Sequence, residues 1–446
     1  MALPKAFCDR MKAYLGEDAD AFFQSLEKEP KRSFRVSSPF LGKEEISSLL
    51  GDALKGEIPF GTSSYYFDFD GIGNHFLHHA GAIYVQEPAA MAPVFALGEE
   101  KAQRILDLCA SPGGKSLQAA DTLLKEDGFI VSNEPSFPRR KVLMQNIERL
   151  GEKRALVTGF DARELPEEFS SSFDLIICDV PCSGEGMMRK NEGAAEDWSE
   201  GKVKELSEIQ KDILESAAKA VCPGGRILYS TCTWSKEENE ENIASFLEKH
   251  PDFFLVMPDE KVFRQGKEGF LPKTLRFYPH IFNGEGQFLA ILRKEGEKNF
   301  PPEKKKKKEK AKKSDPREAT VLAFLSENLE KMPEGEIYFR GEDVYLLPKT
   351  PFSKEIFASP GVLLGQVQKG RLIPHHRFFR AFSYEMKNRV TLSFFDERVE
   401  AYLRGEEIAL DGKGYAALFA EKIPLGGVKA SGGRGKNLYP KGLRKV

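Results

Sequence analysis

Two cysteines in this sequence directly follow stretches that have the character of buried strands, where a thiol can act as a nucleophile. Residues 175–178 form a short apolar run that leads to Asp179 and Cys182, and residues 226–231 form a second run that leads to Cys232. Runs bounded in this way are typical of strands inside a parallel sheet. Ligands bind beyond the carboxyl ends of such strands, so we expect both sulfurs to face one pocket.

A glycine-containing turn follows an earlier apolar run, at residues 105–108. It has neither the glycine spacing of a dinucleotide site nor the order of a P-loop. Its pair Gly113-Gly114 lets the backbone approach a ligand closely. Glu134 follows the next run, where an acid usually binds ribose hydroxyls, and Asp161 follows the third, where an acceptor can meet an adenine amino group.

An acidic residue placed to bind ribose, without a glycine-rich loop that would bind a pyrophosphate, favours S-adenosylmethionine over a nicotinamide dinucleotide. The cation of that cofactor would be stabilised electrostatically by the acids Asp107 and Asp179. The alternative is that these acids only cap helices, but three acids at successive strand ends favour the cofactor. The residues that we assign to the cofactor are Cys109, Ala110, Ser111, Pro112, Gly113, Gly114, Lys115, Glu134, Asp161 and Asp179.

Composition limits the class of protein. A chain of 446 residues exceeds one typical core, and a net charge of -2 with 30% charged residues gives little information about partners. The six cysteines lie mostly in or beside apolar runs, so we expect reduced thiols in the cytoplasm. No cysteine or histidine spacing predicts a metal site, and no apolar run predicts a membrane span or a signal segment.

Four regions differ in their patterns. Residues 1–97 predict an N-terminal RNA-binding lobe that begins with helices, and residues 98–295 alternate strands with helices. This alternation predicts a doubly wound, Rossmann-like α/β sheet. Residues 296–317 predict a lysine-rich linker. The linker either only connects two domains or also binds nucleic acid through its lysines. Residues 318–446 predict a C-terminal α+β unit.

Three smaller features carry further expectations. Residues 235–238 have the pattern of a capping box, which predicts a helix that starts directly after Cys232-Thr233-Trp234. The basic stretch 31–36 is either a solvated face or a contact for phosphates. Arg189 and Lys190 are candidates to hold the phosphates of a nucleic-acid substrate.

The motifs at these positions resemble those of the NOL1/NOP2/Sun family of RNA cytosine-C5 methyltransferases. The resemblance covers residues 3 to 295. It rests on Cys109-Ala-Ser-Pro-Gly-Gly-Lys115, Asp179-Val-Pro-Cys182-Ser-Gly-Glu-Gly186, Tyr229-Ser-Thr-Cys232-Thr233, His78 to Glu87, Arg276-Phe-Tyr-Pro-His280 and Gln287-Phe-Leu-Ala290. The C-terminal unit, with its ending from Asn437 to Arg444, is similar to the PUA-like extension of bacterial RsmF-type members.

This resemblance implies a methyltransferase sheet, S-adenosylmethionine as cofactor, and as target a cytosine of 16S rRNA in the small ribosomal subunit, near the decoding centre. It implies that Cys232 adds to C6 of the cytosine, and that Cys182 assists loss of the C5 proton and release of Cys232. Asp179 would face N3 of the base and share a proton with it. The residues alone leave the two thiols interchangeable, since DNA C5 methyltransferases use the cysteine of the Pro-Cys motif.

Other functions remain open at this point. The first alternative is a tRNA cytosine-C5 methyltransferase of the same family. A non-catalytic RNA-binding module would not need both thiols and all the acids, and an enzyme acting on small molecules or proteins would not need the two thiols. We expect a monomer that binds RNA, without a metal ion and without a membrane.

Overall fold

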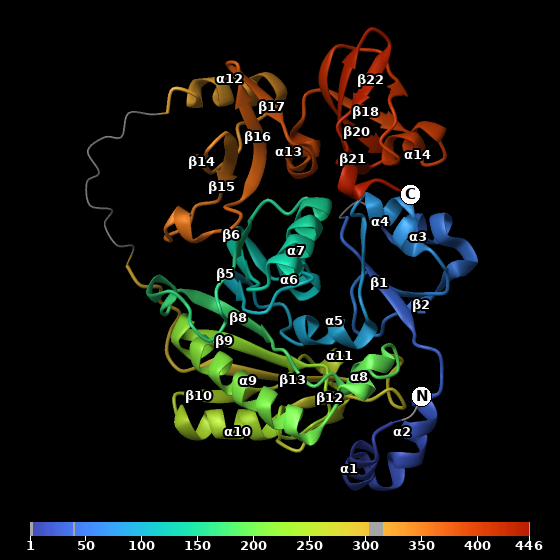
Figure 1. Cartoon of the computed structure of the whole chain (residues 1–446), viewed down its shortest axis with the longest axis vertical. Coiled ribbons are helices and arrows are strands. Elements are labelled where there is room, and N and C mark those ends of the chain that lie inside the picture. The colour runs from blue at the N-terminus through green and yellow to red at the C-terminus, as the bar shows by residue number, and fades with distance from the viewer. Residues whose placement is uncertain (1–2, 39–40, 303–314, 446) are drawn as a thin grey trace.

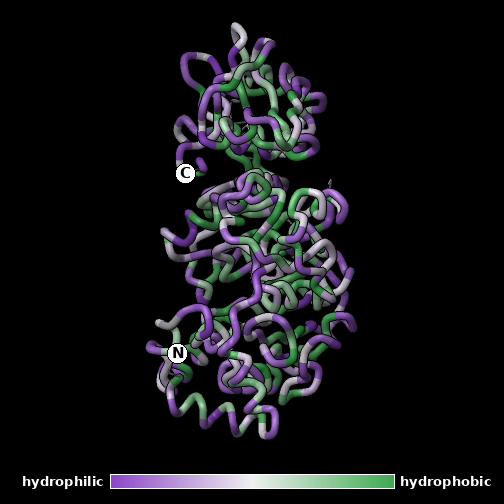
Figure 2. The backbone as a smooth tube through the Cα atoms, turned by 90° about the vertical axis from the view of Figure 1, so that its right-hand side faces the viewer, coloured by the Kyte–Doolittle hydropathy of each residue, from purple (hydrophilic) through white to green (hydrophobic). Residues whose placement is uncertain are grey.

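The computed structural model describes residues 3–38, 41–302 and 315–445, apart from the side chain of Glu192 (Figure 1). Most of the lysine-rich linker expected at residues 296–317 therefore lies outside the described residues. The molecule is elongated, and its C-terminal region forms one end of the long axis (Figures 1 and 2).

A single large sheet forms the centre of the chain, with strands in the order β11-β12-β13-β9-β8-β5-β6-β7 and with β10 paired to β13. The five strands from β9 to β7 in this order run parallel, and β13 is antiparallel to β9. The chain adds β6 and β7 on one side of β5, then β8 and β9 on the other. The carboxyl ends of β5 and β8 therefore mark the topological switch point, where ligands bind in such sheets.

The predicted apolar runs lie within strands of this sheet, while β11 and β12 were not predicted. The bounds of the strands are β5 (Ala102–Asp107), β6 (Leu124–Asn133), β7 (Ala155–Thr158), β8 (Phe173–Asp179), β9 (Val221–Thr231), β10 (Phe253–Val256), β11 (Lys267–Glu268), β12 (Leu275–Phe277) and β13 (Gln287–Lys294). Alternate residues face opposite sides, so Ile177 belongs to one core and Ile176 to the other.

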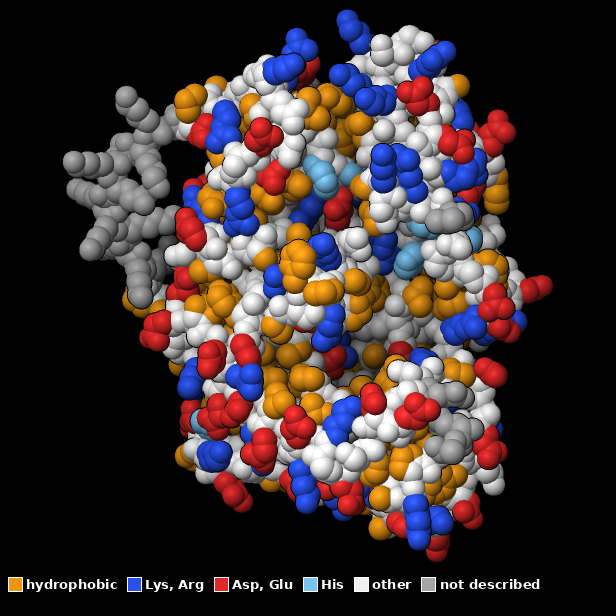
Figure 3. All heavy atoms as spheres, in the orientation of Figure 1, with side chains coloured by type: hydrophobic (Ala, Val, Ile, Leu, Met, Phe, Trp, Pro, Cys, Tyr) orange, Lys and Arg blue, Asp and Glu red, His pale blue; other side chains and the backbone are white. Residues whose placement is uncertain are grey.

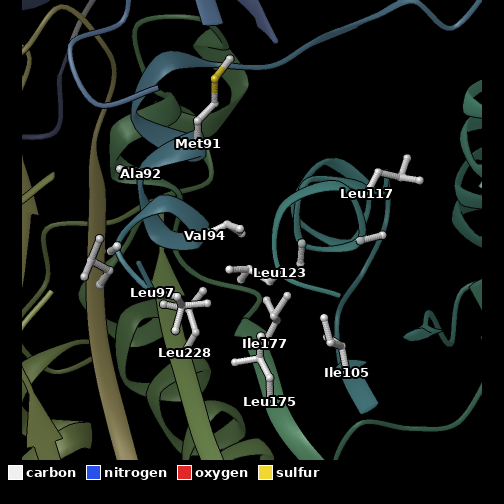
Figure 4. Close-up of a cluster of buried hydrophobic side chains, with 14 of the residues drawn as sticks. Met91, Ala92, Val94, Leu97, Ile105, Leu117, Leu123, Leu175, Ile177 and Leu228 are labelled. Carbon is white, nitrogen blue, oxygen red and sulfur yellow. The ribbon is translucent and has the colours of Figure 1, made fainter. Parts of the chain in front are cut away.

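Helices cover both faces of the sheet, which confirms the doubly wound α/β fold. One face carries α5 (Pro88–Phe95), α6 (Gly114–Thr122) and α7 (Phe137–Leu150), and the other carries α9 (Glu200–Ala220) and α10 (Glu240–Lys249). Figure 4 shows Val94 and Leu123 meeting Ile177 and Leu228 on the first face. Helix α7 ends at Gly151, whose φ of 73° is the left-handed conformation that favours glycine. Shorter helices are α8 (Glu192–Glu196) and α11 (Glu260–Phe263).

The N-terminal lobe contains more strand than the sequence predicted. Helices α1 (Lys5–Leu15) and α2 (Ala19–Leu26) confirm the helical start, and they pack on Trp198, Trp234 and Tyr278 beside the central sheet. The rest of the lobe is a sheet in the order β2-β3-β1-β4 with two short helices. Its elements are β1 (Arg32–Val36), α3 (Lys43–Leu50), β2 (Leu54–Glu57), β3 (Ser64–Phe67), α4 (Phe76–His79) and β4 (Ile83–Val85). These strands have 3 to 5 residues, too few for a period-2 pattern to stand out.

The C-terminal region contains two sheets, β14-β15-β16-β17 and β18-β20-β21-β22-β19. The first includes β14 (Glu336–Arg340), β15 (Asp343–Leu347), β16 (Val362–Gln368) and β17 (Arg371–Pro374), with helices α12 (Glu318–Asn328) and α13 (His376–Phe382). The second includes β18 (Arg389–Leu392), β19 (Ile408–Ala409), β20 (Gly414–Ala420), β21 (Ile423–Ser431) and β22 (Arg434–Asn437), with helix α14 (Glu397–Leu403).

The C-terminal region is packed onto the rest of the chain through shared cores. The first sheet docks on the edge strand β7, where the backbone of Val157 pairs with that of Ser359. Phe352 lies in the same core as Phe129 and Phe173. The second sheet shares a core with the N-terminal sheet, which includes Phe34 from β1.

Candidate active site

The structure brings the two predicted thiols together. Strands β8 and β9 pair in parallel, with Asp179 opposite Ser230, and the chain continues from these ends to the two cysteines. The sulfurs of Cys182 and Cys232 lie 3.2 Å apart. The pKa of the Cys182 thiol is raised well above its usual value, first by the contact with Cys232 and then by burial.

Two buried carboxylates hold the two cysteine loops against each other. Glu238, beyond Cys232, accepts hydrogen bonds from the backbone N–H of Ser183 (2.9 Å) and from Gln210 (2.8 Å). Glu185, beyond Cys182, accepts from the backbone N–H of Trp234 (2.8 Å) and from the hydroxyl of Ser235 (2.7 Å). Each loop therefore supplies a carboxylate that satisfies donors of the other loop.

The prediction of a capping box at residues 235–238, with a helix that starts there, is wrong. Helix α10 begins at Glu240, and Asn239 occupies the position before it. The side chain of Glu238 bonds to Ser183 in the other cysteine loop and so does not cap a helix. Glu185 and Glu238 are parts of the site that the sequence did not predict. Their positions close behind the two thiols are the only signal that pointed to them.

Asp179 is held in a fixed orientation between two neighbours. The ammonium nitrogen of Lys115 lies 2.8 Å from Asp179 Oδ2, and the hydroxyl of Ser230 donates to Asp179 Oδ1 over 2.7 Å. Lys115 is buried, while the Asp179 side chain remains 34% exposed. Lys115, which the sequence placed in the cofactor turn, thus also touches the acid beside the thiols.

The turn from Cys109 to Lys115 lies over the ends of β5 and β6. The backbone N–H of Ala110 donates to the carbonyl of Asn133 (2.9 Å), and the hydroxyl of Ser111 donates to the carbonyl of Arg139 (3.0 Å). The carbonyl of Pro112 accepts from Asn146 of α7 (2.8 Å). Gly113 has a φ of 110° and precedes α6, and a Cβ on it would lie 3.1 Å from Leu143, so this position requires glycine.

The other acids assigned to the cofactor differ in their surroundings. Glu134 lies at the end of β6, is 2% exposed and accepts a hydrogen bond from the backbone of Ser136 (2.9 Å). Asp161 follows β7, and its carboxylate pairs with Arg163 (2.7 Å) at the surface. Asp107 accepts from the Ser116 hydroxyl (2.6 Å), and burial raises its pKa to about 7 despite this bond.

The residues at the switch point fit a nucleoside cofactor with a cationic sulfur. The carboxylates of Asp107, Glu134 and Asp179 end three strands of the sheet, and two of them are buried. Carboxylate oxygens accept from ribose hydroxyls, and their charge favours a cation nearby. Burial raises the pKa of Cys109 and Cys178, which is the behaviour of packed, unreactive thiols.

The expected phosphate contacts are partly wrong. Arg189 is buried, pairs with Glu285 (2.8 Å) and donates to the carbonyl of Ser25 (2.9 Å), so its guanidinium is already used within the protein. In the basic stretch 31–36, Arg35 is buried against Asp121, while Lys31 stays exposed. Burial determined these outcomes, and the residue types alone carry no information about it.

None of the helices in the described ranges has the length and hydrophobicity that a membrane span requires. In the same ranges, no group of three or more His, Cys, Asp or Glu side chains is arranged to hold a metal ion.

Three family models match this chain. The model for the 16S rRNA methyltransferase RsmB/F matches residues 94–293, which contain the central sheet and both thiols. The model for the N-terminal domain of 16S rRNA methyltransferase RsmF matches residues 3–88, and the model for the methyltransferase RsmF PUA domain matches residues 389–445.

Solved structures share the fold. PH0851 is 32% identical with a TM-score of 0.61, and the match covers 66% of this chain and 66% of that chain. NSun6 from Pyrococcus horikoshii, crystallised with SFG, has a TM-score of 0.59 over 66% of this chain and 99% of its own. Its identity of 23% supports the likeness of fold alone.

Whole proteins of known name match nearly the full chain. Ribosomal RNA small subunit methyltransferase F of Vibrio campbellii is 31% identical over 99% of this chain and 97% of its own length. The protein of the same name from Cronobacter sakazakii is 30% identical over 99% of this chain and 96% of its own. The chain therefore belongs to the RsmB/F family of 16S rRNA methyltransferases, and it carries the N-terminal and PUA domains of the RsmF members.

Proposed function

We propose that this protein methylates C5 of a cytosine in 16S rRNA, near the decoding centre, with S-adenosylmethionine as cofactor and a covalent bond between Cys232 and C6 of the base. The observation that carries the proposal is the pair of sulfurs 3.2 Å apart beside a fixed carboxylate, at the switch point of the sheet. A rigid pair of thiols suits a reaction that forms a carbon–sulfur bond and later breaks it.

The cofactor would lie over the turn from Cys109 to Lys115, with Glu134 on its ribose and Asp161 toward its adenine amino group. When bound, it supplies an electrophilic methyl group on a cationic sulfur. Asp107 and Asp179 contribute negative charge near that position, and Gly113 keeps the turn tight against α7.

The first step is addition of the Cys232 thiolate to C6. The electron pair of the C5–C6 bond moves toward C5, and Asp179, oriented by Lys115 and Ser230, shares a proton with N3 to stabilise the charge that develops in the ring. C5, now nucleophilic, accepts the methyl group. Cys182 then assists transfer of the C5 proton to solvent. The electron pair of the C5–H bond re-forms the C5–C6 double bond, the C6–sulfur pair returns to sulfur, and the ring and the Cys232 thiolate are restored.

The target base must leave any helix to reach the thiols, because base-modifying enzymes act on unstacked nucleotides. We assign RNA affinity to the N-terminal lobe, the lysine-rich linker and the PUA domain. We expect the protein to act as a monomer in the cytoplasm, where its RNA substrate is.

Transfer of a tritiated methyl group from S-adenosylmethionine to 16S rRNA, DNA and protein tests this function. We expect label only in the RNA, recovered as 5-methylcytidine after digestion to nucleosides. Label in another nucleoside, in DNA or in protein would contradict the proposal.

A further inference from the structure

A cavity of about 250 Å³ lies between α2 and the loop that precedes β13. Its walls include Ser25, Lys28, Lys31, Arg189, His280 and Asn283. We propose that this cavity is a second RNA subsite, which holds the phosphate and ribose of a nucleotide that flanks the target cytidine. This proposal rests on the proposed function. Pockets for drug-sized ligands measure about 300–1,000 Å³, so the cavity suits a single sugar–phosphate unit.

The cavity has fixed walls because Arg189 joins them. Its guanidinium donates to the carbonyl of Ser25 on the α2 side (2.9 Å) and to the carbonyl of Gly284 on the loop side (3.2 Å), and it pairs with Glu285 (2.8 Å). The two side chains of this ion pair are only 7% and 2% exposed. Charge-assisted bonds in such a setting hold the backbone of both walls in place.

The cavity is connected to the catalytic loops. Arg189 lies in the same segment as Gly186, whose backbone N–H donates to the carbonyl of Cys232 over 2.9 Å. A Cβ on Gly186 would lie 2.7 Å from the Cα of Gly286, so the two segments touch with no room for a side chain. One wall of the cavity therefore belongs to the rigid unit that carries both thiols.

The charges in the cavity favour a phosphate. Lys28 and Lys31 are exposed, and neither forms an ion pair with any residue that the structure describes. Among the described residues of the wall, the other charged side chains are Glu29 and Arg189, and Glu285 neutralises Arg189. Both ring nitrogens of His280 are buried, so this residue contributes the surface of its ring to the wall. Asn283 lines the cavity at an exposed position, and its amide offers donors and an acceptor, which matches a ribose 2′-hydroxyl.

Charge reversal at the two lysines tests the subsite. The full-length Lys28→Glu/Lys31→Glu variant is compared with Lys125→Glu/Lys219→Glu, which makes the same charge change on exposed residues of the central domain, outside the regions to which RNA affinity is assigned. The probe is a 16S rRNA transcript, with methyl transfer measured at varied RNA concentration and RNA binding measured separately by fluorescence anisotropy. A third variant, Gln24→Trp, fills the cavity without changing its charge.

We expect Lys28→Glu/Lys31→Glu to raise KM for the RNA about tenfold, to leave kcat and cofactor affinity unchanged, and to lower the salt slope of RNA binding by about 1.4, as for two lost phosphate contacts. Gln24→Trp should raise KM without changing that slope. Equal KM in the lysine variant and its control, or a fall in kcat alone, would overturn the subsite. Failure of the unmodified protein to methylate the RNA would instead reject the proposed function, while the binding measurement still tests the cavity.

Discussion

At the scale of single residues, the site depends on acids whose surroundings set their tasks. Asp179 is bound by Lys115 and Ser230 yet stays partly exposed, as a group that meets substrate must be. Glu134 is almost completely buried at the end of β6, and its carboxylate lies 3.4 Å from the guanidinium of Arg139. Two carboxylates at the same edge of the sheet, at the ends of β8 and β6, therefore suit different partners.

Glu134→Ala should weaken cofactor binding about tenfold, because a hydrogen bond to a charged group contributes about 1.5–3 kcal/mol. Calorimetric titration with S-adenosylmethionine measures the effect. Glu126→Ala, at an exposed position of the same strand, is the matched control and should bind normally. Unchanged affinity in folded Glu134→Ala would remove this residue from the cofactor site.

Asp107 should make cofactor affinity depend on pH. Burial raises its pKa to about 7, so the side chain is mostly neutral below that pH and anionic above it. Affinity for cationic S-adenosylmethionine should therefore rise relative to neutral S-adenosylhomocysteine between about pH 6 and pH 8. Asp107→Asn should abolish the change. A ratio of the two affinities that stays constant over this range would contradict the assignment.

At the scale of elements, two loops from adjacent strands act as one unit because each supplies a buried carboxylate to the other. Glu185 is 1% exposed and accepts from Trp198 (2.9 Å), Trp234 (2.8 Å) and Ser235 (2.7 Å). These bonds join the Cys182 loop to the Cys232 loop. They explain how the two sulfurs stay within contact without help from a bound ligand.

Glu185→Ala should lower kcat for methyl transfer by about tenfold or more while leaving cofactor affinity unchanged, because it frees the loops but does not touch the cofactor turn. Each buried donor left without a partner costs about 1–3 kcal/mol, so the free energy of unfolding should also fall. Steady-state kinetics and urea unfolding measure the two effects. Glu196→Ala changes an exposed residue nearby and is the control. A normal kcat in Glu185→Ala would show that the two loops keep their positions without the hydrogen bonds to Glu185.

The sequence was sufficient to predict the parallel strands of the central sheet, the doubly wound order and the meeting of the thiols, because buried parallel strands leave a strong local pattern. It failed where a side chain acts across the fold. Glu238 fits a capping box locally, but it bonds to Ser183, which lies far away in the sequence. Arg189 resembles a phosphate contact, but it pairs with Glu285. Local patterns contain no information about such partners.

At the scale of the whole molecule, the C-terminal region is fixed to the catalytic part by buried contacts. Arg380 donates to the carbonyls of Ala80 in the N-terminal lobe, Arg149 in α7 and Pro424 in the second C-terminal sheet. Lys and Arg side chains are interspersed with Asp and Glu on the face shown in Figure 3, so neither positive nor negative electrostatic potential dominates that face. RNA orientation must then depend on fixed domains and local sites.

Phe352→Ala should lower the free energy of unfolding by about 3–5 kcal/mol, as for other large core truncations, although this residue is far from the thiols in the sequence. Because Phe352 packs on Phe129 and Phe173 of the central sheet, the unfolding transition should remain single. Phe395→Ala, at a side chain that is 86% exposed, should change stability by less than about 0.5 kcal/mol. Urea unfolding, monitored with two spectroscopic probes, measures the free energy of unfolding and the number of transitions. Separate transitions for the two regions would contradict a shared core.

The most direct test of the central claim follows the covalent bond between enzyme and RNA. Cys182→Ala should still attack C6 and transfer the methyl group but fail to release the RNA, because the thiol that assists elimination is absent. The enzyme joined to its RNA should then appear as a slower band in a denaturing gel, and this band should weaken when Asp179→Ala is added. Cys232→Ala should form neither adduct nor product. An adduct that accumulates in Cys232→Ala and is absent in Cys182→Ala would reverse the two roles and contradict the mechanism.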